Sequence, residues 1–260
     1  MGTPRRLVIS VKGVTAMQKD SLDEFLGPGV SVAYDDKGQP TKAAIGFARG
    51  KGVDVADLIR KQTPKGEVVC AQVENTGRPT SLLLNEYLPQ LINEIPFQKK
   101  MRWGNKARPF ARPLHWVAAV FDGQALEFEF DGVSSGVVSR GHRFLNPEKF
   151  KIESLESYLK DCEKHFLMVD PAVRKTTILK QVQALAEQAG GHIKEDEDLL
   201  NLVNYLVEYP VAIKGDFDPG FLELPKELLV ITMKYHQKYF PVWDKEENLL
   251  PCFITVSNMP

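Results

Sequence analysis

The stretch FQKKMRWGNKARPFARPLHWVAAVFDGQALEFEFD, residues 97–131, joins a basic segment to the clearest hairpin pattern in the chain. The fourteen residues from Lys99 to Arg112 hold six cations and no acid, and aromatic rings stand among them. Gly104, Pro109 and Pro113 break any helix, so a structured loop that leads into a strand is predicted. Cations beside flat rings suit phosphates and stacked bases, whereas a solvated loop with rings plugged into the core would have the same composition.

The second half of this stretch predicts an antiparallel hairpin. Leu114 to Phe121 forms its first strand, and Asp122-Gly123 is a favoured two-residue turn. The return strand alternates Leu126, Phe128 and Phe130 with acidic residues, which is typical of a sheet with one buried and one solvated face. Helical and strand patterns lie on both sides of the hairpin without strict alternation. The chain is therefore predicted to be α+β on a largely antiparallel sheet.

The remaining elements follow from periodicity and from capping residues. Strands are expected at residues 7–11, 67–73, 137–144, 211–214, 239–243 and 249–256. Helices are expected over 41–50, 53–60, 153–165, 171–189, 196–206 and 225–234, with another beginning at Thr80 or Ser81. The pattern becomes mainly helical near residue 150. One α+β region over 1–260, with lobes 1–150 and 151–260, is the resulting expectation.

Composition limits the possible functions. The 260 residues carry a formal net charge of -1, so any contact with nucleic acid must come from local basic patches. The three cysteines are far apart and form no C-x-x-C pair, which argues against zinc ribbons and redox dithiols and fits a reducing cytoplasm. No apolar run approaches the roughly 20 residues of a membrane helix, so no membrane partner is expected.

The usual catalytic and metal-binding signatures are missing. Residues 46–52, GFARGKG, are one residue too short for a phosphate loop and lack its hydroxyl residue. The five histidines form no pair at helical spacing, and neither G-x-S-x-G nor H-E-x-x-H occurs. We therefore expect no catalytic residue, no metal site and no bound cofactor within this chain.

Two further cationic clusters accompany the basic loop: RGHR at 140–143, and KYHQKYF at 234–240. Each alone reads as a surface patch with a structural histidine, but three that converge would form an RNA-facing surface. Trp103 and Trp116 are expected to be structural. The candidate RNA-binding residues are Lys99, Lys100, Arg102, Arg112, Arg140, His142, Arg143, Lys234 and Lys238.

These motifs occur in an order that resembles one family. They are MRWG at 101–104, RPLHW at 112–116, RGHRF at 140–144, LVEYPV at 206–211 and TMKYHQKYFPV at 232–242. The segments PRRL at 4–7, KAAIGFAR at 42–49 and LPCFITVSN at 250–258 complete the set. The chain is similar, over essentially its whole length, to the beta chain of bacterial glycyl-tRNA synthetase.

The resemblance implies a fold similar to the editing-type domain of the phenylalanyl-tRNA synthetase beta chain. It implies a cytoplasmic enzyme of two alpha and two beta chains, in which the alpha subunit uses ATP and Mg to activate glycine and the beta subunit binds the tRNA for glycine. Both ends of the sequence look cut, so a fragment without the HD-like and anticodon-binding domains is expected. Two alternatives stay open: an editing hydrolase that clears mischarged tRNA, and a structural module at a subunit interface.

Overall fold

The computed structural model describes residues 1–260, and its contacts divide the chain into two units. Unit 1 consists of Met1–Lys12 together with Pro96–Pro260, and unit 2 is Gly13–Ile95. The chain thus leaves unit 1 after twelve residues and returns to it at Pro96. The sequence suggested a lobe boundary near residue 150, whereas the contacts divide the chain near residues 12 and 96.

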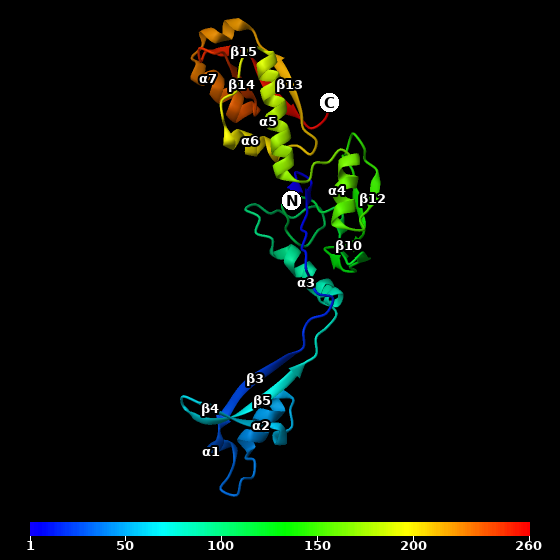
Figure 1. Cartoon of the computed structure of the whole chain (residues 1–260), viewed down its shortest axis with the longest axis vertical. Coiled ribbons are helices and arrows are strands. Elements are labelled where there is room, and N and C mark those ends of the chain that lie inside the picture. The colour runs from blue at the N-terminus through cyan, green and yellow to red at the C-terminus, as the bar shows by residue number, and fades with distance from the viewer. The chain divides into compact units, whose positions relative to one another are not determined.

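Unit 2 contains a three-stranded antiparallel sheet in the order β3-β5-β4, and Figure 1 shows α2 beside it. The pairing of β3 with β5 extends from Ser21 opposite Asn75 to Gly29 opposite Val68. Small residues such as Ala44 and Ala48 on α2 pack against Val69 on β5 to form the core. Its elements are β3 (Ser21–Gly29), α1 (Val30–Ala33), α2 (Lys42–Lys51), η1 (Val55–Asp57), β4 (Ile59–Thr63), β5 (Gly66–Asn75) and α3 (Thr80–Glu94).

Capping explains where α2 begins and ends. The side chain of Thr41 accepts a hydrogen bond from the backbone N–H of Ala43 at 3.2 Å. Gly52 closes the helix in the left-handed conformation, with φ of 73°, which a glycine adopts without steric penalty. The predicted helix over 41–50 is therefore confirmed, together with the strand at 67–73 and the helix start at Thr80.

The N-terminal part of unit 1 is built from short strands. They are β1 (Gly2–Thr3), β2 (Arg6–Leu7), β6 (Val117–Ala118), β7 (Val120–Phe121), β8 (Gln124–Ala125), β9 (Glu129–Phe130), β10 (Val133–Gly136), β11 (Val138–Arg140) and β12 (Lys149–Lys151). Most pairs are antiparallel, as expected, but β10 pairs with β6 in the parallel sense. The predicted strand over 7–11 is wrong, because β2 ends at Leu7.

The predicted hairpin is split into two. The pair β7–β8 turns at Asp122-Gly123 as expected, but a second turn at Asp131-Gly132 connects β9 to β10. Between them, the Ser135 hydroxyl donates to the carbonyl of Leu126 at 2.6 Å and accepts from the N–H of Phe128 at 2.8 Å. The Ser135 side chain therefore adds to the backbone hydrogen bonds here, such as that from the N–H of Ser135 to the carbonyl of Phe128 at 2.8 Å. Leu126 and Phe130 are buried as their alternation predicted.

The C-terminal part of unit 1 packs helices on a three-stranded antiparallel sheet in the order β13-β15-β14. Buried residues of α5, including Ile178 and Val182, share one core with Val242 and Ile254 of the sheet (Figure 1). The elements are α4 (Leu155–Lys164), α5 (Pro171–Gln188), α6 (Glu197–Asn204), β13 (Val211–Asp216), η2 (Pro219–Glu223), α7 (Lys226–Ile231), η3 (Thr232–Gln237), β14 (Phe240–Trp243) and β15 (Leu249–Ser257). None of the helices has the length and apolar character that a membrane crossing demands.

Candidate nucleic-acid interface

The RGHR motif begins at the end of β11 and turns back toward β12. Ser139 lies opposite Phe150 and is buried, so the next residue of the strand, Arg140, points to the exposed side. Gly141 is buried because the chain is crowded there. A Cβ on Gly141 would lie 2.1 Å from the carbonyl oxygen of Asn146. Only glycine therefore fits between the two arginines of the motif.

His142 has a different role from the predicted one. Its side chain is fully buried, and its Nδ1 accepts from the backbone N–H of Leu145 at 3.2 Å and lies 3.4 Å from that of Phe144. Its Nε2 lies 2.9 Å from the amide nitrogen of Asn258. The ring is enclosed and cannot reach a ligand in this conformation. The expectation that His142 contacts RNA is corrected to a structural role: it holds the turn that presents Arg143.

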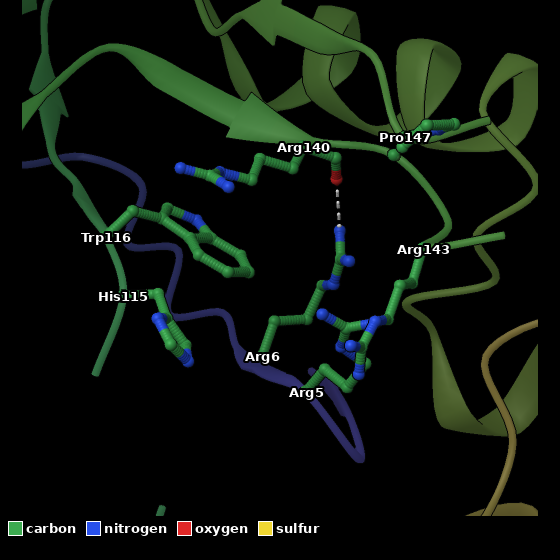
Figure 2. A pocket seen from close by; sticks show the side chains of 8 residues that line it. Arg5, Arg6, His115, Trp116, Arg140, Arg143 and Pro147 are labelled. Atoms are coloured by element: carbon green, nitrogen blue, oxygen red, sulfur yellow. Dashed lines mark hydrogen bonds between the residues drawn. The ribbon is translucent and has the colours of Figure 1, made fainter. Parts of the chain in front are cut away.

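A buried ion pair fixes Arg6 beneath the motif. The Arg6 Nε donates to Glu208 Oε1 at 3.1 Å, and the hydroxyl of Thr3 donates to the same oxygen at 2.6 Å. The side chains of Arg6 and Glu208 are only 5% and 1% exposed. Nη1 of Arg6 also donates to the carbonyl of Arg140 at 2.9 Å, the dashed line in Figure 2. The N-terminal hairpin thus supports the RGHR turn directly.

Trp116 lies against two of these cations. The guanidinium carbons of Arg6 and Arg140 are 5.8 Å and 5.7 Å from the centroid of its ring. Distances below about 6 Å allow the negative ring face to attract the cations. Trp116 is half-buried, just before β6, and His115 beside it is exposed. The expectation of a structural Trp116 is compatible with these contacts, which also place it at the edge of a cavity.

The positive charges of Arg5 and Arg143 repel one another. Figure 2 shows Arg5 and Arg143 side by side. Loss of hydration lowers the pKa of Arg5 below its ordinary value, and the charge of Glu208 opposes this shift. The like charges of Arg143, Arg6 and Arg112 lower the pKa further. An arginine stays protonated at neutral pH, so the site holds concentrated positive charge.

These side chains surround a cavity of about 280 Å³, which we call the arginine cavity. Arg5, Arg140 and Arg143 form no salt bridge with a carboxylate in the structure. Convergent guanidinium donors without an acid partner are suited to bind a phosphate or carboxylate. The lining residues are Arg5, Arg6, His115, Trp116, Arg140, Gly141, Arg143 and Pro147.

The basic loop contributes less to the site than its composition predicted. The Trp103 Nε1 donates to the carbonyl of Phe110 at 3.0 Å, and Met101 and Phe110 form a β-bridge, so the loop is fastened to itself. Lys99, Lys100 and Arg102 are exposed but do not line the arginine cavity. Arg112 is exposed and lies close enough to Arg5 to lower its pKa. Only the end of this loop therefore approaches the arginine cavity.

The third cluster also stands apart from the cavity. Lys234 forms an ion pair with Asp196, and the Lys238 ammonium donates to the carbonyl of Tyr235. Neither lysine lines the arginine cavity. Conversely, Arg5 and Arg6 were not among the predicted contacts. Their adjacency in the PRRL segment was the available signal. The strand predicted over 7–11 did not include them, whereas the structure places them in and beside the short hairpin of β1 and β2.

The comparisons with known proteins agree with the sequence motifs. A family model described as glycyl-tRNA synthetase beta subunit matches residues 1–260. The chain belongs to the glycyl-tRNA synthetase beta-subunit family. It is 50% identical over 258 residues to the glycine–tRNA ligase beta subunit of Geobacter sp. (strain M21), and 49% identical over 258 residues to that of Citrifermentans bemidjiense. The corresponding protein of Syntrophus aciditrophicus is 47% identical over 257 residues.

The match covers 99% of this chain in each of the three relatives, but only 37–38% of the relatives' own length. Both units of the structure lie within the region that the beta-subunit family model describes.

Proposed function

We propose that the chain is part of a glycine–tRNA ligase beta subunit and that it binds tRNA through the arginine cavity during ATP-dependent glycylation of tRNA. Membership of the beta-subunit family supports the reaction. The observation that carries the binding role is the convergence of Arg5, Arg140 and Arg143 without carboxylate partners around Trp116. Because the chain's net charge is -1, such a local patch is the means by which it attracts a polyanion.

In this proposal the adenylation chemistry belongs to a partner alpha subunit, which uses ATP and Mg, in a cytoplasmic assembly of two alpha and two beta chains. The chain itself binds no cofactor. Its part is to hold the tRNA, since the cavity offers donors and a ring but no nucleophile positioned by a base.

The test is tRNA binding by the assembled enzyme with Arg140→Ala and Arg143→Ala combined. Each lost phosphate contact removes charge-assisted hydrogen bonds, so we expect the dissociation constant to rise at least about tenfold. The slope of log affinity against log salt concentration should fall by about 2, because two phosphate contacts are lost. A filter-binding titration at several salt concentrations measures both quantities.

Lys160→Ala with Lys180→Ala serves as the control, since it removes two exposed cations of unit 1 outside the cavity. It should change affinity much less. If the two double variants weaken tRNA binding equally, the cavity has no special role and the proposal fails. The same assay on Lys99→Ala with Arg102→Ala tests the remaining predicted contacts of the basic loop.

The proposed fold likeness to the editing-type domain of the phenylalanyl-tRNA synthetase beta chain draws support only from the α+β architecture with small antiparallel sheets. The proposed function does not include editing. Editing needs a polar pocket with a positioned water, and the His142 ring is fully buried and cannot hold a water in such a pocket. Incubation with seryl- or alanyl-tRNA of the glycine acceptor would reveal deacylation above background if this view were wrong.

A further inference from the structure

A second cavity adjoins the arginine cavity and shares Trp116 and Arg140 with it. It has a volume of about 180 Å³ and a different lining, which contains Val117, Val138 and Gly136. Ser134 and Lys149 add one hydroxyl and one cation. We call it the valine cavity. Two cavities of contrasting chemistry thus share one tryptophan–arginine pair in their linings.

We propose that the two cavities are adjacent subsites for two consecutive unpaired nucleotides of an RNA strand, divided by Trp116 and Arg140. The inference rests on the proposed tRNA binding and specifies its substrate class. A phosphate is held in the arginine cavity by Arg5 and Arg143. The next nucleotide places its base over the valines, and its phosphate faces Lys149.

The lining of each cavity fits this assignment. No acidic residue lines the arginine cavity, and the Glu208 carboxylate beneath it is buried and already bonded to Arg6 and Thr3. The cavity therefore offers mainly donors. In the valine cavity the aliphatic walls favour a flat apolar surface, whereas a bare anion would gain little from them. A base has such a face, and only an unpaired base can expose it.

The dividing pair supplies planar surfaces. Nucleobases stack on aromatic rings and on guanidinium planes, and such stacking tolerates any base. Trp116 and Arg140 line both cavities, with the guanidinium 5.7 Å from the ring centroid. Arg6 is held on the same ring by its bond to Glu208, so the tryptophan is oriented before any ligand arrives.

A substitution at Gly136 can fill the valine cavity selectively. It lines that cavity but not the arginine cavity, and a Cβ added to it would meet no atom within 4 Å. A larger side chain can therefore project into the valine cavity without disturbing the fold. The backbone pairing of Gly136 with Ala118 does not involve a side chain.

The experiment titrates the full chain with 5′-phosphorylated uridine and with the corresponding 5′-phosphorylated dinucleotide, by calorimetry. The dinucleotide should bind about tenfold more tightly, because a second base is stacked. In Gly136→Val the dinucleotide should bind only as well as the mononucleotide, whose own affinity is unchanged. Arg143→Ala should weaken both ligands. Lys149→Glu reverses the charge of the one cation that lines the valine cavity and not the arginine cavity. It should also reduce the dinucleotide advantage, and it leaves Gly136 in place.

An equal affinity for both ligands in the unaltered chain overturns the inference, and so does an undiminished dinucleotide advantage in both Gly136→Val and Lys149→Glu. Equal binding of a 12-base-pair RNA duplex, or of inorganic phosphate, would show a plain anion site instead, and preference for polyglutamate would indicate an acidic protein partner. These failures are distinct from failure of the proposed function, in which tRNA affinity itself does not respond to Arg140→Ala with Arg143→Ala.

Discussion

The residues of the RGHR motif differ sharply in role although they are neighbours. Arg140 and Arg143 are exposed and line the arginine cavity, whereas His142 is fully buried and Gly141 is enclosed. The two inner residues shape the turn, and the two outer residues present their guanidinium groups at the arginine cavity. A motif of this kind is informative as a unit, but its composition alone does not say which member faces solvent.

Gly141→Ala should destabilise the protein and weaken tRNA binding. The new Cβ would lie 2.1 Å from Asn146 O and 2.9 Å from the Cβ of His165, so backbone must move. Overpacking of this kind costs about 1–3 kcal/mol, which a urea unfolding curve can measure. Gly136→Ala is the matched control, because its Cβ enters open space. Equal stability of the two variants would contradict the crowding seen at Gly141.

Cys162 predicts a pH dependence of stability. It is fully buried in the core between α4 and β12, and burial raises the pKa of its thiol to about 11 from 9.0. The folded state therefore keeps its proton where the unfolded chain loses it. This contribution is fully present below pH 9.0 and is lost as pH rises toward about 11, by at most about 1.4 kcal/mol per pH unit.

The measurement compares urea unfolding at pH 8 and pH 10.5 in the unaltered chain and in Cys162→Ala. The variant should lose less stability over this interval, since one buried ionisable group is gone. Burial also raises the pKa of Tyr158, which acts in the same direction in both proteins. An identical loss in the two proteins would show that the thiol does not contribute.

At the scale of elements, capping residues were the most reliable signals. Asp170 and Pro171 begin α5 as predicted, and the Asp170 carboxylate accepts from the N–H of Ala172 at 2.8 Å. The buried stripe of α5 includes Ile178 and Val182 as expected, but also Arg174, whose Nε donates to the carbonyl of Asn204 at 2.8 Å. A buried arginine of this kind depends on a partner 30 residues away, which periodicity does not reveal.

Asp170→Ala should destabilise the protein by about 0.5–2 kcal/mol, because two N–H groups at the start of α5 lose their acceptor. Thermal unfolding should show a corresponding fall in Tm. Asp170→Asn, which keeps a side-chain oxygen at the cap, should restore most of the stability. A full loss in the asparagine variant would mean that charge, and not capping, is the important property.

The hairpin shows why sequence patterns reached only part of the candidate site. Alternation from Leu126 to Phe130 correctly gave the buried face, yet the strand is interrupted between β8 and β9, and a second turn follows at Asp131-Gly132. Lys106 contributes to that turn by donating to the carbonyl of Asp131 at 2.7 Å. One of the six cations of the basic loop, which was not among the predicted RNA contacts, is therefore engaged with the protein's own backbone.

At the scale of the whole molecule, the arginine cavity combines segments that are distant in sequence. Arg5 and Arg6 come from the first residues, Trp116 precedes β6, and Arg140 ends β11. Glu208, from the helix-rich part of the chain, holds Arg6 in place. Contacts across such separations cannot be read from local periodicity, which is why the sequence identified the family and the RGHR motif but not the full site.

Glu208→Gln should destabilise the chain and weaken tRNA binding together. The substitution leaves the buried Arg6 cation without its counter-charge, and breaking a buried pair in this way costs about 3–5 kcal/mol. Urea unfolding measures the loss. The exposed Glu187→Gln on α5 is the control and should be nearly silent. If Glu208→Gln matched that control in stability, the ion pair would not hold the N-terminal hairpin.

The distance in sequence between Arg6 and its partner determines when the ion pair can form during biosynthesis. Its partner Glu208 follows 202 residues later, an interval of roughly 10 to 40 seconds at about 5–20 residues per second. During that time unit 2, which is made entirely of residues 13–95, can fold as it emerges from the ribosome. Until Glu208 has been synthesised, Arg6 in the first strands lacks its carboxylate partner. The arginine cavity therefore forms late in translation. A nascent chain that stops short of residue 208 lacks the Arg6–Glu208 ion pair that holds Arg6 at the cavity.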